Sequence, residues 1–384
     1  MKQRMKWKKV IPAGLILLSV LLCSMARLLP GLADCYVNHV FPIWVETYGR
    51  IAGVFPFSVG EVLLYLAVLL VLIWAIAGVC LVVYRLLADH NGNIIRKLQS
   101  AYKAYTMFLY WVAGIVCLIM VLNCFMLYRV SPITERYQIG AGSKADYGRE
   151  EIIALRNYVV EEANALAPLM ERDAEGYLVY TGDMKGEAKA QMRRLGEMFP
   201  NLKGYYPNPK PLYFSGFFSQ QYIMGYYFPF SMEANYNSMM YVGNYPTTFC
   251  HELSHLKGFI LEDEANFIGY LACVDSEDLF FKYSAYLSVI RYLDRDFYKA
   301  IGEDEEAYAR HPAISELVLK DKIFLTEKAW EQVEEKAVLD TELVEQVSDT
   351  FTETTLTLNG VKDGKVSYSR VVDLLLRYYD GILY

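Results

Sequence analysis

The sequence predicts a membrane protein in which three N-terminal transmembrane helices precede an α+β, mainly helical domain. The 384-residue chain is 54% hydrophobic and 21% charged, with a mean hydropathy of +0.17. This is more apolar than a soluble protein of that length. The apolar excess lies within residues 1–130, in stretches long enough to cross a bilayer as helices. The remaining chain, from residue 131 on, is long enough to bury a core of its own.

Three segments are predicted to span the membrane, at residues 10–29, 59–84 and 105–128. The first follows a basic start, which is also typical of a signal peptide. Because two further spans follow it, an uncleaved anchor is favoured. The second span carries Glu61 near one end, and the third is interrupted only by Gly114 and Asn123.

The distribution of basic residues predicts the orientation of the chain. The N-terminus and the loop 85–103 are basic, whereas the loop 30–58 carries only Arg50. Basic loops stay on the cytoplasmic side of a membrane. We therefore expect a multi-pass protein of the cell membrane whose N-terminus is cytoplasmic and whose C-terminal domain, after Arg129, is extracytoplasmic.

The C-terminal part divides into a linker at 131–148, with a glycine-rich turn at 140–143, and a domain at 149–384. Apolar periodicity predicts helices at 149–169, 186–199 and 276–298, and a final helix at 368–379. Residues 204–245 contain too many prolines and glycines for helices, so we expect short strands and loops there. One of these strands is predicted at 238–242, and 235–242 is the candidate edge strand.

The central motif is His251-Glu252-Leu253-Ser254-His255, on a helix that Pro246 begins and Gly258 ends. Residues four apart lie on one face of a helix, so both imidazoles can reach one ion. Glu252 can then act as the general base on a metal-bound water. The spacing is that of the zinc-protease helix, and the cofactor it predicts is Zn²⁺.

A catalytic zinc site needs a third protein ligand, and the sequence offers several acidic candidates. A third histidine three residues after Gly258 is excluded, because that residue is Leu261. The next helix begins with Glu262, Asp263 and Glu264. Glu264 is preferred because it shares a helix face with Ile268 and Leu271, Glu262 is the alternative, and Asp263 is expected to cap the helix or to be solvated.

Two families resemble this chain. The segment Glu264-Ala265-Asn266-Phe267 after the histidine motif resembles the zinc site of Glu-ligand zincins, particularly ImmA/IrrE-type peptidases. A wider resemblance joins residues 227–230, 249–270, 359–364 and 368–376 to a bacterial membrane family called domain of unknown function 3810. The resemblance implies a zincin-like fold for 149–384 and a zinc peptidase whose substrate is not assigned.

Several other residues are candidates for supporting roles. His311 is the only other histidine of the C-terminal domain and is a candidate donor to the developing oxyanion. Asn266 and Asp275 are candidates to orient the ligand histidines. In zinc proteases of this type, an edge strand holds the substrate backbone by strand addition.

The sequence thus supports a membrane-anchored zinc metallopeptidase that hydrolyses peptides or proteins outside the cytoplasmic membrane. The alternative is a non-catalytic, zincin-like envelope sensor or partner-binding protein. A net charge of −7 and the lack of a glycine-rich phosphate loop argue against nucleic acid as a partner. The pattern does not fix an oligomeric state.

Overall fold

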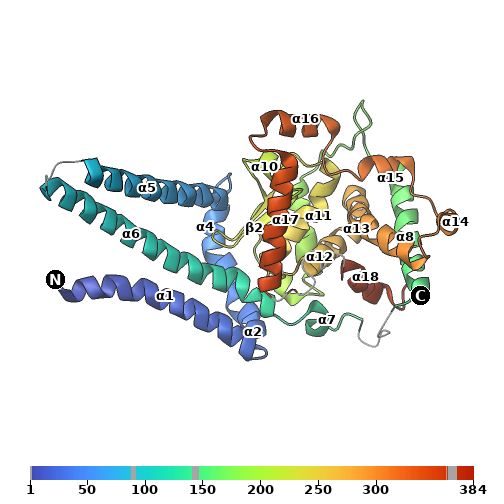
Figure 1. Ribbon diagram of the computed structural model, residues 1–384. Coiled ribbons are helices and arrows are strands. Elements are labelled where there is room, and N and C mark those ends of the chain that lie inside the picture. Colours follow the sequence, from blue (N-terminus) through green and yellow to red (C-terminus); the bar gives the residue numbers. More distant parts are fainter. Residues whose placement is uncertain (1, 88–91, 141–146, 360, 362–369) are drawn as a thin grey trace.

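The computed structural model describes residues 2–87, 92–140, 147–359, 361 and 370–384. Three long helices extend to one side of a mainly helical body (Figure 1). They are α1 (Lys2–Leu28), α5 (Val59–Leu87) and α6 (Gly92–Met120). The chain of α6 continues through a π turn, η2 (Val121–Phe125), and a 3-10 turn, η3 (Leu127–Arg129), into the body.

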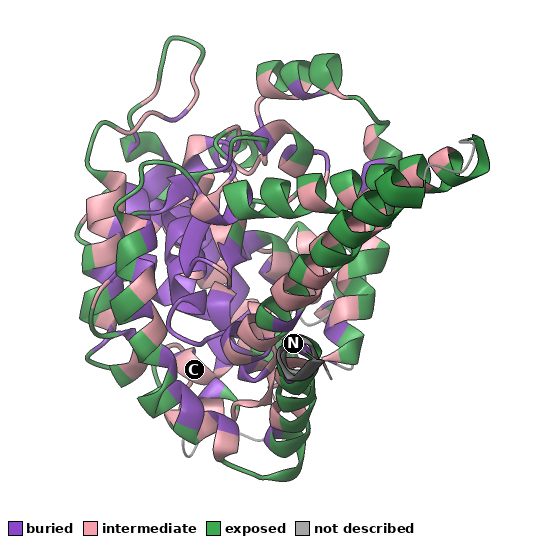
Figure 2. Cartoon of the chain, turned by 90° about the vertical axis from the view of Figure 1, so that its left-hand side faces the viewer, coloured by how far each residue is buried: buried purple, intermediate pink, exposed green. Residues whose placement is uncertain are grey.

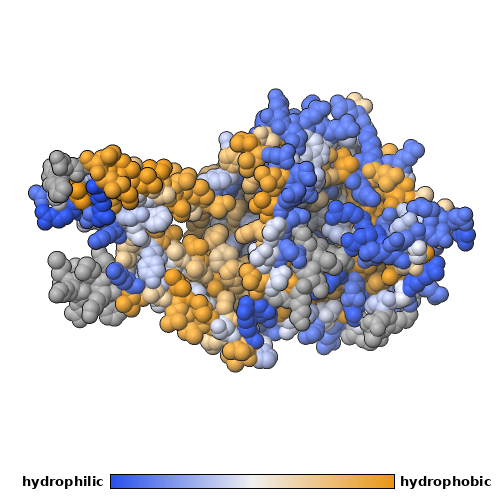
Figure 3. Space-filling model, in the orientation of Figure 1, coloured by the Kyte–Doolittle hydropathy of each residue, from blue (hydrophilic) through white to orange (hydrophobic). Residues whose placement is uncertain are grey.

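The three long helices have the length and hydropathy of membrane spans, which confirms that part of the prediction. The apolar segments are Lys9–Leu28, Val59–Leu87 and Gly92–Arg129, with mean hydropathies of 2.0, 3.1 and 2.3. Their large apolar side chains are mostly exposed, as in lipid-facing helices (Figure 2). Figure 3 shows this hydrophobic surface ending where the helices meet the more polar body.

The segment between the first two spans is part of the body, although the sequence indicated only a loop there. It forms α2 (Leu32–His39), α3 (Phe41–Trp44), η1 (Val45–Gly49) and α4 (Arg50–Gly53). Val37, Phe41 and Val45 are buried in the same core as the helices of the C-terminal part. The core therefore includes residues from both sides of the predicted domain boundary.

The centre of the body is a set of packed helices. α11 and α12 are in extensive contact, and α12 also packs on α13. A Cβ at Gly269 would lie 3.0 Å from the carbonyl oxygen of Thr247, so this glycine allows α12 to approach α11 closely. The helices of this group are α8 (Arg149–Leu166), α9 (Met184–Leu195), α11 (Tyr245–His255), α12 (Glu262–Val274), α13 (Leu279–Ala300) and α18 (Val371–Tyr379).

A small sheet lies beside α11. Its strands are β1 (Lys210–Pro211), β2 (Gly225–Phe228) and β3 (Glu233–Tyr236), in the order β1-β3-β2. β1 is parallel to β3, and β2 is antiparallel to it. The strand predicted at 238–242 is wrong, because Asn237 accepts a hydrogen bond from the backbone N–H of Met239 and so turns the chain after β3.

Short helices complete the chain, and the linker is partly helical. The predicted glycine-rich turn falls largely on 141–146, and the family-like segments at 359–364 and 368–376 fall partly on 360 and 362–369; these residues lie outside the described part. The remaining α-helices of the described residues are α7 (Ile133–Arg136), α10 (Ser215–Ser219), α14 (Glu305–Tyr308), α15 (Glu316–Asp321), α16 (Glu327–Lys336) and α17 (Thr341–Leu358). Three 3-10 turns accompany them, η4 (Ala167–Leu169), η5 (Pro200–Leu202) and η6 (Val242–Asn244).

Candidate metal centre

The helix that carries the histidine motif begins and ends as the sequence predicts. Pro246 occupies the first turn of α11, where its missing N–H costs nothing. Gly258 follows the helix with a φ of 91°, which favours glycine. A Cβ there would lie 2.2 Å from Cγ2 of Val37 in α2. The end of the motif helix is therefore packed against the segment between the first two spans.

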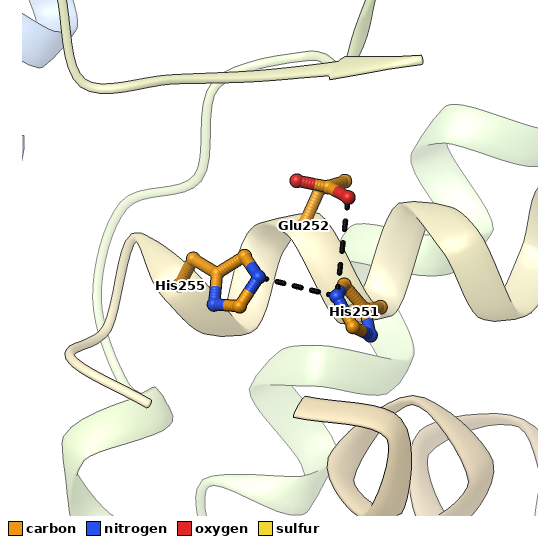
Figure 4. A group of neighbouring side chains, drawn as sticks. All are labelled: His251, Glu252 and His255. Carbon is orange, nitrogen blue, oxygen red and sulfur yellow. Dashed lines mark hydrogen bonds and ion pairs between the residues drawn. The ribbon is translucent and has the colours of Figure 1, made fainter. Parts of the chain in front are cut away.

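The two imidazoles of the motif face each other. Nε2 of His251 and Nε2 of His255 are 3.1 Å apart (Figure 4). Nδ1 of His251 lies 2.9 Å from Oδ1 of Asn266, and Nδ1 of His255 lies 2.7 Å from the carbonyl oxygen of Phe259. Both partners are acceptors, so each ring carries a hydrogen on Nδ1 and turns Nε2 toward the other ring. Two lone pairs at this distance repel unless a proton or a cation lies between them.

Glu262, and not Glu264, is the acidic residue beside these nitrogens. One oxygen of Glu262 is 3.1 Å from Nε2 of His251, and the other is 4.0 Å from Nε2 of His255. The carboxylate of Glu264 instead accepts from the backbone N–H of Ile133 at 2.7 Å and pairs with Arg136 at 3.1 Å. Successive residues of a helix are turned by about 100°, so positions two apart point to nearly opposite sides. The preferred third ligand, Glu264, is therefore corrected to the alternative, Glu262, which lies on the side of α12 that faces the histidines.

Glu252 is buried next to the imidazoles. Its Oε1 lies 4.0 Å from Nε2 of His251, and its Oε2 has no hydrogen-bond partner among the described residues. A Cβ at Gly225 would lie 2.4 Å from Oε1 of Glu252, so β2 passes directly over this carboxylate. The glycine leaves the space that the glutamate occupies.

Burial and neighbouring charges set the protonation of this cluster. Burial raises the pKa of Glu252 to about 8, and the charge of Glu262 adds to this effect. Burial and the neighbouring His251 lower the pKa of His255 to about 4. Burial acts to lower the pKa of His251, but the Glu262 carboxylate outweighs it and raises that pKa. His255 is therefore neutral at pH 7, as a metal ligand must be.

Side chains of this cluster could hold a metal ion. Ligand atoms of His251, Glu252 and His255 lie within 4.8 Å of one another. Glu262 is nearer than Glu252 to the Nε2 atom of His251, which makes a ligand set of two imidazoles and the Glu262 carboxylate. Two histidines and one glutamate form a common catalytic zinc set, and acceptors on Nδ1 are the usual outer partners of ligand histidines. The residues present therefore fit zinc.

His311 lies in a different part of the molecule from the motif. Its Nδ1 is 3.2 Å from Nδ2 of Asn157 on α8, and its ring packs on Phe297 near the end of α13. It follows α14, which lies at the end of the body farthest from the long helices (Figure 1). This placement does not support the expected role of His311 as a donor to the oxyanion. The separation of His311 from the motif along the sequence gave no information on where it lies in the fold.

The edge strand beside the site is β2, because β3 lies in the middle of the sheet. The backbone N–H of Asn237 donates to the carbonyl of Met224, which makes these residues a hydrogen-bonded pair. Pairs alternate along an antiparallel ladder, so Tyr226 bonds β3 while Gly225 and Tyr227 turn their backbone groups to the open edge. Among the described residues, none hydrogen-bonds those outward groups. The candidate edge at 235–242 is corrected to 225–228.

Two contributors to the site could not be recognised from the sequence. Gly225 stands in a glycine- and tyrosine-rich stretch with no motif, and its role depends on the approach of β2 to Glu252. Phe259 acts through its backbone carbonyl, which any residue type supplies. Asn266, in contrast, is a candidate that the structure places on His251.

The chain belongs to the family described as "Protein of unknown function (DUF3810)", whose model matches residues 36–376. The match includes the segment between the first two spans as well as the histidine motif. No curated protein and no solved structure matches the chain.

Proposed function

We propose that the protein is a membrane-anchored zinc metallopeptidase of zincin type that hydrolyses peptide bonds outside the cytoplasmic membrane. The observation that carries the proposal is the convergence of two imidazole Nε2 atoms and the Glu262 carboxylate beside the buried, unpaired oxygen of Glu252. The spacing of His251, Glu252 and His255 supports the same class.

In this proposal, His251, His255 and Glu262 hold the ion. A zinc ion in such a set lowers the pKa of water to roughly 7 and polarises a carbonyl. A cation held beside Glu252 would favour its ionised form. Glu252 would then take up a proton on Oε2, the oxygen without a partner among the described residues, and deliver it to the leaving nitrogen. Asn266 and the Phe259 carbonyl keep both imidazoles turned toward the ion.

The open edge of β2 supplies a place for the peptide. An extended segment can pair with the outward backbone groups of Gly225, which is half-buried, by strand addition. Because Gly225 lies over Glu252, a bond held there is next to the base. The side chains of the peptide would then alternate between the site and solvent.

The proposal is tested with the full-length protein and the Glu252→Gln variant. Since the segment 30–58 contributes to the core, residues 131–384 alone would lack part of their own core. We expect about one zinc per chain by mass spectrometry in both proteins. Hydrolysis of a peptide library should fall by about 10²–10⁴-fold in the variant. Equal hydrolysis by both proteins would disprove the mechanism. Zinc without hydrolysis in either protein would favour the alternative function, a non-catalytic envelope sensor or partner-binding protein.

A further inference from the structure

The strand over the candidate base is fixed to the ends of two membrane spans. A Cβ at Gly60, in the first turn of α5, would lie 2.4 Å from Cγ of Phe228 in β2. The hydroxyl of Tyr227 donates to the carbonyl of Asn123 in η2 at 3.1 Å. The carboxylate of Glu233, on the neighbouring strand, accepts from the N–H of Gly60 at 2.7 Å. β2 therefore cannot move away from the spans without breaking buried contacts.

Counting residues along the two spans puts these contact points at the end of the bilayer. The third span becomes apolar at Tyr105, and about twenty helical residues cover the roughly 30 Å of hydrocarbon. That length places the boundary near Cys124, next to Asn123. Counted in the same way from Tyr84 at the opposite end of α5, the boundary of the second span falls near Tyr65. Gly60 is then little more than one turn beyond the hydrocarbon.

The candidate metal ligands are only one side chain away from this boundary. The ring of Tyr227 lies 6.0 Å from the ring of His255, and its hydroxyl reaches the carbonyl of Asn123. The site is thus at the bilayer surface and not at the distal end of the body.

The surface beside β2 has the composition of a membrane interface. Tyr226 of β2 is 43% exposed and contacts the ring of Phe218 at 6.2 Å. Phe214 is also exposed and packs edge-to-face on Tyr65 of α5 at 5.1 Å. Exposed tyrosines at the ends of spans are typical of the headgroup region. Aromatic side chains are therefore exposed both at the end of α5 and on β2.

We propose that the substrate is the extended segment of another membrane protein directly after its membrane span, cut within about ten residues of the bilayer. The inference rests on the proposed hydrolase function and adds the location of the bond. Hydrolysis adds one water across the C–N bond and leaves a carboxylate on one fragment and an amine on the other. Its result is the release of a domain from its anchor.

The test uses full-length protein in liposomes together with a randomised twelve-residue library. The library is attached directly after a transmembrane helix, or after the same helix and a 40-residue Gly/Ser spacer, which has a mean span of roughly 35 Å. A site at the bilayer surface cuts the directly attached library at least as fast as the spaced one. A site far from the bilayer cuts only the spaced library, because a short tether gives almost no effective concentration there. The second result overturns the inference and leaves the hydrolase intact.

Two controls separate the possible failures. Cleavage of neither library, nor of the same peptides in solution, rejects the hydrolase itself and the inference with it. Equal cleavage of dissolved and directly attached peptides at matched concentration rejects only the membrane location.

Capture of the peptide provides a readout that does not need turnover. A photo-crosslinking amino acid replaces Tyr226 in the Glu252→Gln variant, and in a matched variant it replaces Leu169, an exposed residue that follows α8. We expect position 226 to capture about tenfold more of the directly attached library than position 169, because a tethered peptide that reaches the site has a high effective concentration there. Equal capture at both positions contradicts the inference.

Discussion

Two clusters of this protein each contain a histidine that bonds an asparagine, but they differ in whether their polar atoms are left facing one another. In the α11–α12 cluster, His251, His255 and Glu262 turn their free atoms toward one point. In the α8–α13 cluster, His311 bonds Asn157, while the neighbouring Arg156 bonds Asp294, Tyr308 and the carbonyl of Pro312. Both clusters contain a histidine held by an asparagine. Only the first leaves ligand atoms facing one another.

The difference shows how a buried polar group indicates function. Every nitrogen of the Arg156 guanidinium has a partner, so these bonds stabilise the packing of α8 on α13. In the motif cluster, Oε2 of Glu252 and Nδ2 of Asn266 are buried and have no partner in the described part of the chain. Buried groups that lack partners are costly, and two nitrogens of Arg136 share this property away from the motif. What distinguishes the motif cluster is that its unpaired groups lie beside two facing imidazole nitrogens.

The largest effect that distinguishes the clusters is the loss of metal. His255→Ala removes one of three proposed ligands, so zinc should fall from about one per chain to nearly none. His311→Ala should retain full zinc, because its ring lies among α8, α13 and the segment after α14. Mass spectrometry of both purified full-length variants measures this. Loss of zinc in His311→Ala would mean that the two clusters are not independent.

The two glutamates of α12 provide the next contrast. Glu262→Ala should lose zinc with little change in folding. Glu264→Ala should keep zinc and lower the free energy of unfolding by about 3–5 kcal/mol, since it leaves Arg136 buried without its partner. Denaturant titration and zinc content together check the pair. The opposite assignment of effects would restore Glu264 as the ligand.

A smaller effect is expected from Gly225→Ala. Its Cβ would overlap Oε1 of Glu252, so the carboxylate must move while the histidines stay in place. Displacing a catalytic group by about 1 Å costs roughly 100-fold in rate. Zinc content should not change. Val68→Ala, on the exposed face of α5, is the control that should hydrolyse peptides like the wild type. A normal rate for Gly225→Ala would place β2 farther from the base than the structure does.

The sequence predicted the parts of the molecule that depend on local pattern. The three apolar helices and the start and end of α11 follow from hydropathy, Pro246 and Gly258. It failed where the answer depends on how elements meet. The choice between Glu262 and Glu264 depends on the rotation of α12 against α11, and a rotation of two residues reverses it. The burial of Val37 and Phe41 likewise depends on contacts with residues more than 200 positions away.

The smallest and most specific contrast concerns the two asparagines that bond a histidine. Asn266 lies 2.9 Å from Nδ1 of His251, and Asn157 lies 3.2 Å from Nδ1 of His311. Asn266→Ala should weaken zinc binding by about 10–100-fold, because it removes the acceptor that orients a proposed ligand. Asn157→Ala removes an amide that donates to its histidine, whereas the amide oxygen of Asn266 accepts from His251. It should leave zinc affinity unchanged, with a loss of only about 0.5–1.5 kcal/mol of stability. Competition with a chelator of known affinity measures both variants. If both lost zinc equally, the effect would be one of general stability, and the orientation of His251 by Asn266 would have no part in the site.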